Sequence, residues 1–295
     1  MSHPPFELIS EHACFGGVQR FYQHPSLEIG LPMRLSVFLP RQALVSSNPV
    51  PAVLYLAGLT CNEETFATKA GAQRHAAEHG LVLIAPDTSP RGACVTGESD
   101  HWDLGVGAGF YLDATQAPWA IHYRMESYLL HELLPLLVAT LPIDGARLGI
   151  FGHSMGGHGA LTLALRHPGR FLSLSALAPI CAPSQCEWGK KAFTAYLGAD
   201  PSTWSSHDAT ALMAASPKEK IPFPGGILID QGLADKFLLQ QQLYPDHFES
   251  ACEHAGQPLT LRRHPGYDHG YYFISTFMAD HLAHHAQLLN AGRDR

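Results

Sequence analysis

The chain has 295 residues, of which 46% are hydrophobic and 15% charged, a composition that excludes disordered, collagen-like and coiled-coil proteins. Its formal charge of −7 offers no basic surface for a phosphate backbone, so we expect no nucleic-acid partner. The chain has six cysteines without a C-x-x-C pair, and it shows neither a secretory leader at its start nor an apolar run of membrane-spanning length. We therefore predict a cytoplasmic protein without a membrane partner.

The N-terminal part of the chain is predicted to form strands over residues 6–39. Apolar and polar residues alternate from Met33 to Leu39, which is typical of a half-buried antiparallel strand. A polar connection over 42–51 follows. The apolar run Ala52–Ala57 then predicts a central parallel strand that is buried on both faces.

Helices and strands alternate through the rest of the chain. The expected elements are a helix over 63–79, a strand over 81–85, a helix over 124–141 kinked at Pro135, a strand over 147–151, a helix over 155–167, strands over 171–178 and 226–230, a helix over 236–254, a strand over 259–264 and a helix over 271–289. This alternation predicts an α/β fold, with a mostly parallel central sheet, helices on both faces and an antiparallel N-terminal edge.

Two long stretches, at about 88–120 and 180–224, do not fit the alternation. Connections of this length in a compact protein are usually functional loops or a small cap. No internal repeat or linker separates the chain into parts. We therefore predict a single domain over 1–295 with these two excursions.

The sequence around Ser154 carries the strongest chemical signal. A buried strand leads into Gly152-His153-Ser154-Met155-Gly156, and a helix follows. This G-x-S-x-G layout is typical of the nucleophile elbow of α/β-hydrolases, in which a strained turn exposes the serine hydroxyl. The backbone N–H of Met155, at the start of the helix, is then expected to stabilise an oxyanion.

A serine nucleophile needs a histidine base, and His269 is the best candidate because its loop joins the last strand to the last helix. That position lies at the same sheet edge as the elbow. The other histidines are weaker candidates: His264 ends a strand, His153 and His158 are expected to pack locally, and His281, His284 and His285 are expected on a solvated helix face. His281 and His285 have metal-ligand spacing but no evident third ligand, so we predict no metal.

The acid of the triad is expected in the loop after the strand over 226–230. Asp230 ends that strand, whereas Asp235 lies deeper in the loop, where it could reach His269. Position alone favours Asp235 and leaves Asp230 open. Asp268 is excluded because sequence neighbours rarely face one another.

A second oxyanion donor is expected after the strand Ala52–Ala57, and the N–H of Leu59 is the candidate. Cys61 follows closely and is interpreted either as a redox-sensitive thiol near the site or as a buried small hydrophobic residue. The run Gly105–Gly109 does not follow a buried strand, so we interpret it as a pocket-lining loop and not as a cofactor site.

At these residues the chain resembles the S-formylglutathione hydrolase family, also called esterase D. The matching stretches are Tyr55–Cys61, Pro86–Gly92, Gly97–Asp103, Gly152–Leu161, Leu228–Asp235 and Gly266–Ile274. By this resemblance Ser154, Asp235 and His269 match the family's triad, and Leu59 and Met155 match its oxyanion donors. Ala57 and Leu104 depart from the family's pattern without touching a catalytic group.

The resemblance implies hydrolysis of S-formylglutathione to glutathione and formate, a step of formaldehyde detoxification, with no cofactor. It also suggests a homodimer. Arg91, Lys190 and Lys191 are candidate partners for the carboxylates of glutathione. The alternatives are a general short-chain carboxylesterase or acyltransferase on the same fold, and a binding protein that has lost catalysis.

Overall fold

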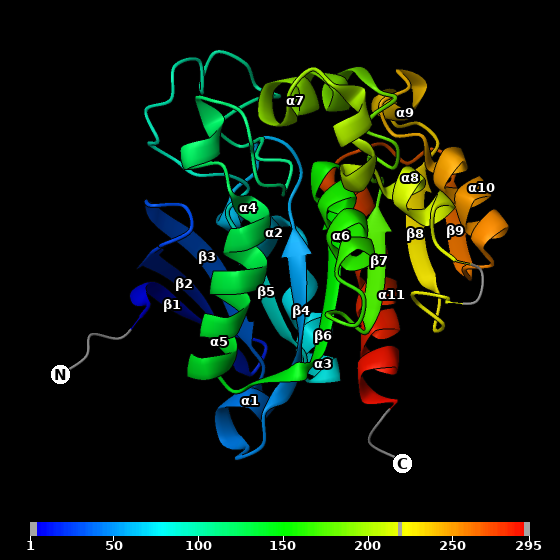
Figure 1. Ribbon diagram of the computed structural model, residues 1–295. Helices are drawn as coiled ribbons and strands as arrows, with labels where there is room; N and C mark the ends of the chain where they lie inside the picture. The colour runs from blue at the N-terminus through cyan, green and yellow to red at the C-terminus, as the bar shows by residue number, and fades with distance from the viewer. Residues whose placement is uncertain (1–4, 218–219, 292–295) are drawn as a thin grey trace.

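The computed structural model describes residues 5–217 and 220–291. In these residues nine strands form one sheet, in the spatial order β1-β2-β3-β5-β4-β6-β7-β8-β9 (Figure 1). The strands are β1 (Glu7–Cys14), β2 (Gly17–Pro25), β3 (Pro32–Leu39), β4 (Val50–Leu56), β5 (Val82–Pro86), β6 (Ile143–His153), β7 (Ser173–Leu177), β8 (Ile227–Gly232) and β9 (Leu259–His264). Strands β1 to β3 and the β3–β5 pair are antiparallel, and all other neighbours are parallel. The predicted fold is confirmed.

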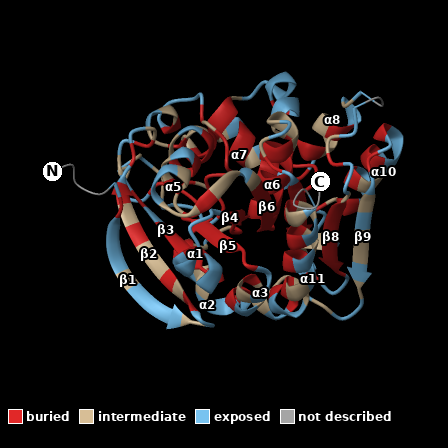
Figure 2. Ribbon diagram, turned by 90° about the horizontal axis from the view of Figure 1, so that it is seen from below, coloured by how far each residue is buried: buried red, intermediate tan, exposed pale blue. Residues whose placement is uncertain are grey.

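Helices cover both faces of the sheet. They are α1 (Arg41–Val45), α2 (Glu63–Lys69), α3 (Ala72–His79), α4 (Met125–Ser127), α5 (Leu134–Thr140), α6 (Met155–Arg166), α7 (Glu187–Leu197), α8 (Ala209–Ala214), α9 (Lys236–Leu239), α10 (Pro245–Ala255) and α11 (Tyr271–Asn290). Helices α5 and α6 lie on one face, and α3 and α11 lie on the other (Figures 1 and 2). Figure 2 also shows that burial concentrates on the central strands, while β1 is exposed at the edge.

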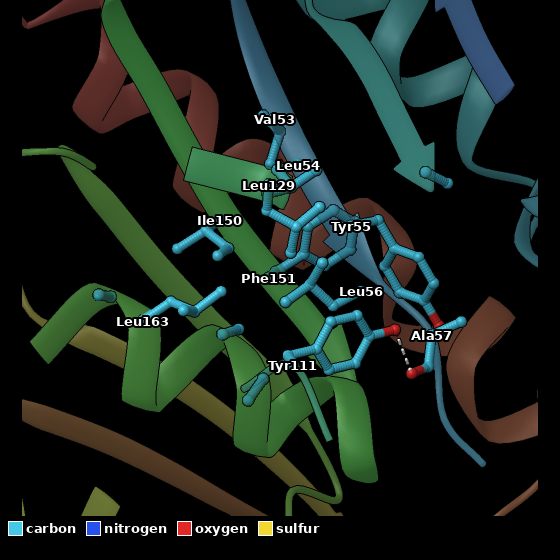
Figure 3. Packing of buried hydrophobic residues seen from close by; sticks show 14 of the residues in the cluster. Val53, Leu54, Tyr55, Leu56, Ala57, Tyr111, Leu129, Ile150, Phe151 and Leu163 are labelled. Atoms are coloured by element: carbon cyan, nitrogen blue, oxygen red, sulfur yellow. Dashed lines mark hydrogen bonds between the residues drawn. The ribbon is translucent and has the colours of Figure 1, made fainter. Parts of the chain in front are cut away.

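All seven residues of β4 are buried in the core. The ring of Tyr55 stacks on Phe66 at 3.7 Å between centroids. Tyr111, from the first excursion, donates a hydrogen bond from its hydroxyl to the Ala57 carbonyl at 2.8 Å (Figure 3). Each large side chain buried in this way contributes about 1.5–3 kcal/mol of transfer free energy. The same contacts that stabilise β4 therefore fix the end of the strand from which the Leu59 loop departs.

Two of the predicted helices are each split in two. Between α2 and α3 the chain turns at Gly71, which has a left-handed φ of 66°. Between α9 and α10 it turns at Tyr244, with φ 51°, directly before Pro245. Proline disfavours helical geometry in the preceding residue, so the predicted helix over 236–254 cannot continue through this point. The predicted connection over 42–51 is also partly wrong, since it contains most of α1 and the start of β4.

The predicted helix over 124–141 departs from regular α-helical geometry. It begins with α4, passes through a π-helical segment over Tyr128–Leu133 and continues as α5. Pro135 lies in the first turn of α5. Because proline supplies no N–H to the preceding turn, a locally wider hydrogen-bonding pattern precedes it.

The first excursion and α7 of the second lie at the carboxyl ends of the parallel strands, above the sheet in Figure 1, and the second excursion then descends past α8 to the start of β8. The first holds a single helical turn at Trp119–Ile121, and the second holds α7, two short 3₁₀ turns (Pro201–Thr203 and Ser205–His207) and α8. The hydroxyl of Tyr196 on α7 donates to the Ala108 carbonyl at 2.9 Å and accepts from the Gly105 N–H at 2.8 Å. The two excursions therefore form one connected layer over the sheet. Among the described helices, none combines the length and apolar character needed to cross a bilayer.

Candidate active site

Ser154 stands at the junction of β6 and α6, with φ 56° and ψ −119°. A non-glycine residue in this region is strained, and its surroundings must hold it there. The Ser154 N–H donates to the Leu177 carbonyl at 3.0 Å, and its carbonyl accepts from His158 at 2.9 Å and Ile180 at 3.2 Å. The strained turn is therefore fixed from β7, from α6 and from the start of the second excursion.

The glycines on either side of Ser154 are required by the close approach of neighbouring backbone. A Cβ at Gly152 would collide with the Gly156 carbonyl, and a Cβ at Gly156 would collide with the carbonyl of Leu56. Both collisions involve main-chain atoms that cannot move aside. The G-x-S-x-G spacing is thus the spacing that allows this turn to pack against β4.

The loop after β4 lies directly beside the serine. A Cβ at Gly58 would stand 3.2 Å from the Ser154 Cβ, which shows how closely the two segments approach. The loop is held by a hydrogen bond from the Thr60 N–H to the Gly107 carbonyl at 2.9 Å. Within the described residues, neither the Leu59 nor the Met155 N–H donates a backbone hydrogen bond. Both candidate oxyanion donors are therefore available.

His269 and Asp235 meet at the carboxyl end of β8. The Nδ1 of His269 lies 2.5 Å from Oδ2 of Asp235, and because a carboxylate only accepts, Nδ1 carries the proton. Asp235 is fully buried, yet its pKa is lowered, since the hydrogen bond from His269 and that from the Phe237 N–H outweigh the effect of burial. The carboxylate thus holds the imidazole with Nε2 directed away from it.

Comparisons with known proteins agree on one family. The Esterase family model, described as "Putative esterase", matches residues 26–284. S-formylglutathione hydrolase of Mus musculus is 54% identical over 283 residues, covering 96% of this chain and 98% of the relative. The enzyme of the same name from Paracoccus denitrificans is 50% identical over 284 residues, with the same coverage of both chains.

The solved structure of an S-formylglutathione hydrolase from Agrobacterium tumefaciens superposes with a TM-score of 0.90 at 48% identity, covering 96% of this chain and 99% of that one. The chain belongs to the S-formylglutathione hydrolase family. It is a hydrolase with the α/β-hydrolase fold, as the resemblance in the sequence implied.

The enzyme holds Ser154 and His269 in one cavity of about 200 Å³. Its walls are largely apolar, formed by Trp102, Trp188 and Phe237, whose rings contact one another edge to face. No hydrogen bond joins the serine and the imidazole within the described structure, and in such sites this bond often tightens only when substrate binds. The small volume and the apolar rings of the walls suit a short acyl group.

His153 packs behind the imidazole of His269, with 4.4 Å between the ring centroids. Neither of its ring nitrogens has a hydrogen-bond partner within the described residues. Burial, and secondly the nearby His269, lower the pKa of His153 well below its usual value. His153 therefore stays neutral and adds no positive charge beside a protonated His269.

Cys61 lines the same cavity as a free thiol. Burial raises the pKa of its thiol. A protonated thiol is a poor nucleophile and oxidises slowly, which favours the interpretation of Cys61 as a packing residue. Its carbonyl accepts hydrogen bonds from Thr88 at 2.6 Å and from Arg91 at 3.1 Å, so this residue also fixes the path of the Leu59 loop.

Asp230, the alternative acid, is held in a separate buried network. Its two oxygens accept from the Arg262 guanidinium at 2.6 Å each, from His264 at 2.9 Å and from His281 at 3.0 Å. Burial opposes ionisation, but these donors hold the pKa of Asp230 well below its usual value. With both oxygens occupied by these donors, Asp230 cannot also orient His269.

The expectation of a solvated histidine face on the last helix is wrong for His281 and His285, which are fully buried. His285 hydrogen-bonds Ser173 at 2.6 Å and Ser175 at 3.0 Å, and His281 bonds Ser175 at 2.8 Å. These serines on β7 satisfy ring nitrogens that would otherwise be buried without partners. Within the described residues, no group of three side chains is arranged to hold a metal ion.

Gln231 belongs to the site but was not predicted from the sequence. Its side-chain amide is fully buried and donates to Asp235 Oδ2 at 3.2 Å and to the Gly232 carbonyl at 3.0 Å. The only sequence signal is a polar residue at the buried end of a parallel strand, directly after Asp230. Such a residue is unfavourable in the core unless it has a partner there.

The three cations that were candidates for binding glutathione are already paired. The ion pairs are Arg91–Asp87 at 2.6 Å, Lys190–Glu187 at 3.2 Å and Lys191–Asp103 at 2.5 Å. Guanidinium and ammonium groups carry several N–H donors, so such a cation can bind a second carboxylate, as Arg262 does with Asp230 and Asp280. The three residues therefore stay candidates, with part of their donor capacity already used.

Proposed function

We propose that this enzyme hydrolyses the thioester S-formylglutathione to glutathione and formate, with Ser154 as nucleophile, His269 as base and Asp235 as the orienting acid. The observation that carries the proposal is the cavity in which a strained serine and an imidazole held by a buried carboxylate share one small apolar space. The names and the identity of the relatives support the choice of substrate.

In the proposed first step, Ser154 Oγ attacks the formyl carbon while its proton moves to Nε2 of His269. The negative charge that forms on the carbonyl oxygen is stabilised by the N–H groups of Leu59 and Met155. The tetrahedral intermediate then breaks its carbon–sulfur bond. The released thiolate of glutathione takes up the proton from His269, which leaves a formyl ester on Ser154.

Thioester cleavage suits this site because a thiolate is a good leaving group, with a thiol pKa of about 8.5. Proton donation from His269 therefore matters less here than in amide hydrolysis. In the second step His269 removes a proton from water, and the resulting nucleophile attacks the formyl carbon. The ester bond to Ser154 then breaks as His269 returns that proton to Ser154 Oγ, and the formic acid released loses its own proton to solvent. The products are formate and the free serine, and no cofactor takes part.

The same proposal places the enzyme in formaldehyde detoxification, downstream of a reaction that oxidises a formaldehyde adduct of glutathione to the thioester. The test compares kcat/KM for S-formylglutathione with kcat/KM for 4-nitrophenyl acetate. We expect the thioester to be preferred by orders of magnitude. A preference for the aryl ester would favour a general carboxylesterase instead.

A fluorophosphonate probe tests the nucleophile separately, because it labels an activated serine whatever the natural substrate is. We expect labelling of the folded enzyme and none of Ser154→Ala. Folded wild-type enzyme that is not labelled would indicate a binding protein without catalysis.

A further inference from the structure

A second cavity adjoins the cavity that holds Ser154. It measures about 410 Å³ and is lined by Ala234, Lys236, Phe237, Asp268, His269 and Gly270. The rings of Phe237 and His269 line both cavities. A substrate attached at Ser154 can therefore extend past these two rings into the second cavity.

One cation and one anion line this second cavity, and both are exposed. The Lys236 ammonium lies over the Phe237 ring, 4.7 Å from its centroid, and no ion pair engages it within the described residues. The Asp268 carboxylate accepts the Gly270 N–H at 2.9 Å and likewise makes no ion pair in the described part of the chain. The cavity thus offers a free ammonium and a free carboxylate to a ligand.

Opposite charges that line one cavity without an ion pair fit a zwitterion. Glutathione carries one at its γ-glutamyl end, where a single carbon bears an ammonium and a carboxylate group. We propose that this cavity binds the γ-glutamyl end of S-formylglutathione, with Lys236 on the α-carboxylate and Asp268 on the α-ammonium. This inference rests on the proposed function, because it names the part of that substrate which the second cavity receives.

The distance between Lys236 and the imidazole agrees with the assignment of the carboxylate. Lys236 Nζ lies 4.7 Å from the Phe237 centroid, and that centroid lies 4.8 Å from the His269 ring, so Nζ is at most about 10 Å from the imidazole. An extended chain spans about 3.5 Å per residue, so two residue lengths and one hydrogen bond of about 3 Å cover the same distance. The γ-glutamyl carboxylate of a substrate bound at Ser154 can therefore reach Lys236.

Lys69 provides a matched control for Lys236. Its ammonium also lies over an aromatic ring, 5.8 Å from the centroid of Tyr271, and it too is exposed. Lys69 lines neither of the two cavities. A general effect of removing one positive charge near the site would appear in both lysine variants, whereas a contact with the substrate would appear only at Lys236.

The experiment pairs each variant with a substrate analogue that lacks the matching charge. The substrates are S-formylglutathione, an analogue with 4-aminobutyryl in place of γ-glutamyl, which lacks the carboxylate, and one with glutaryl, which lacks the ammonium. For Lys236→Met we expect KM to rise about 5-fold to 10-fold with S-formylglutathione and to stay unchanged with the 4-aminobutyryl analogue. Asp268→Asn keeps an acceptor for the Gly270 N–H. For this variant we expect KM to rise by the same factor with S-formylglutathione and to stay unchanged with the glutaryl analogue, which lacks the ammonium.

Lys236→Arg is expected to keep most of the affinity, and Lys69→Met to behave as wild type with all three substrates. An equal change in KM for all three substrates in Lys236→Met would overturn the proposed subsite, as would no change at all. The proposed function is tested by the wild type alone: if it does not cleave S-formylglutathione, that proposal fails. If the wild type cleaves S-formylglutathione but the KM changes of the variants do not depend on which charge the substrate lacks, only the proposed subsite fails.

Discussion

At the scale of single residues, Ser154 combines a strained backbone with the proposed chemistry. We expect Ser154→Ala to lower kcat by about 10⁴-fold to 10⁶-fold, because removing the nucleophile leaves only substrate binding and the oxyanion donors. Steady-state kinetics measure this, with the exposed serine variant Ser206→Ala as the control. A loss below 100-fold would show that Ser154 is not the nucleophile.

We expect Gln231 to be a positioning residue, because it contacts Asp235 and does not line the cavity that holds Ser154. Its amide donates to the carboxylate oxygen that also accepts from His269. Replacing it with methionine keeps the volume and removes this hydrogen bond to a charged group, worth about 1.5–3 kcal/mol. We expect Gln231→Met to lower kcat about 10-fold with little change in KM.

The control for Gln231→Met is the exposed Gln240→Met, which should retain wild-type kcat. Circular dichroism shows whether each variant is folded. A rise in KM with unchanged kcat would mean that Gln231 shapes substrate binding and does not orient the acid.

At the scale of elements, the two aspartates in and just after β8 make different contacts. Asp235, just beyond the strand, contacts His269, whereas Asp230, within it, joins β9 and α11 through Arg262 and His281. We expect Asp235→Asn to reduce kcat far more than Asp230→Asn, because only the first change replaces the carboxylate beside the imidazole by a neutral amide, whose NH₂ group can favour the wrong tautomer of His269. Kinetics of both variants test this, and the reverse ranking would move the acid to Asp230.

The buried network of Asp230 also predicts acid sensitivity. The donors of Arg262 and His281 lower the pKa of Asp230 in the folded state, against the effect of burial. A carboxylate with a lowered folded pKa stabilises the protein fully above its unfolded pKa of about 3.9, and this contribution is lost as the pH falls below that value. The free energy of unfolding, from denaturant titrations at several pH values, should therefore fall less steeply below pH 4 in Asp230→Asn than in wild type. Equal slopes would contradict the role of this network.

Most elements could be predicted from the sequence because their apolar periodicity is strong, as in the run that became β4. The breaks were harder to predict. Gly71 and Tyr244 adopt left-handed φ values that composition alone does not require. The burial of His281 was missed because its partners, Ser175 and Asp230, lie far away in sequence and become neighbours only when β7 and β8 pair beneath α11.

The residues of the candidate site also differ in whether the sequence alone predicts them. Ser154 and its flanking glycines form a pattern within five consecutive residues, so the sequence alone predicts it. Gln231 could not be found, since its role depends on the loop returning Asp235 to the end of the same strand. Local patterns are therefore predictable here, whereas the groups that support them depend on tertiary contacts.

At the scale of the whole molecule, the prediction of a single domain has a direct spectroscopic test. All four tryptophans lie in the two excursions, at Trp102, Trp119, Trp188 and Trp204, so fluorescence reports on that layer. Far-ultraviolet circular dichroism reports mainly on the sheet and its helices. Because Tyr111 and Tyr196 tie the excursions to β4 and to each other, we expect the two signals to change at the same denaturant concentration.

An earlier transition in fluorescence than in circular dichroism would contradict this expectation. It would show that the excursions unfold as a separate cap over an intact sheet. The control is the same pair of denaturation curves measured on enzyme labelled with the fluorophosphonate. The label at Ser154 adds no tryptophan, so the fluorescence still reports on the two excursions.

The hydrogen bonds that fix the strained turn come from Leu177, His158 and Ile180, and none comes from the walls of the cavities. The indole rings of Trp102 and Trp188 line the cavity of Ser154 without taking part in these bonds. A laboratory library confined to these two positions should therefore yield new acyl and thiol preferences, while its folded members keep their reactivity toward small phosphonates.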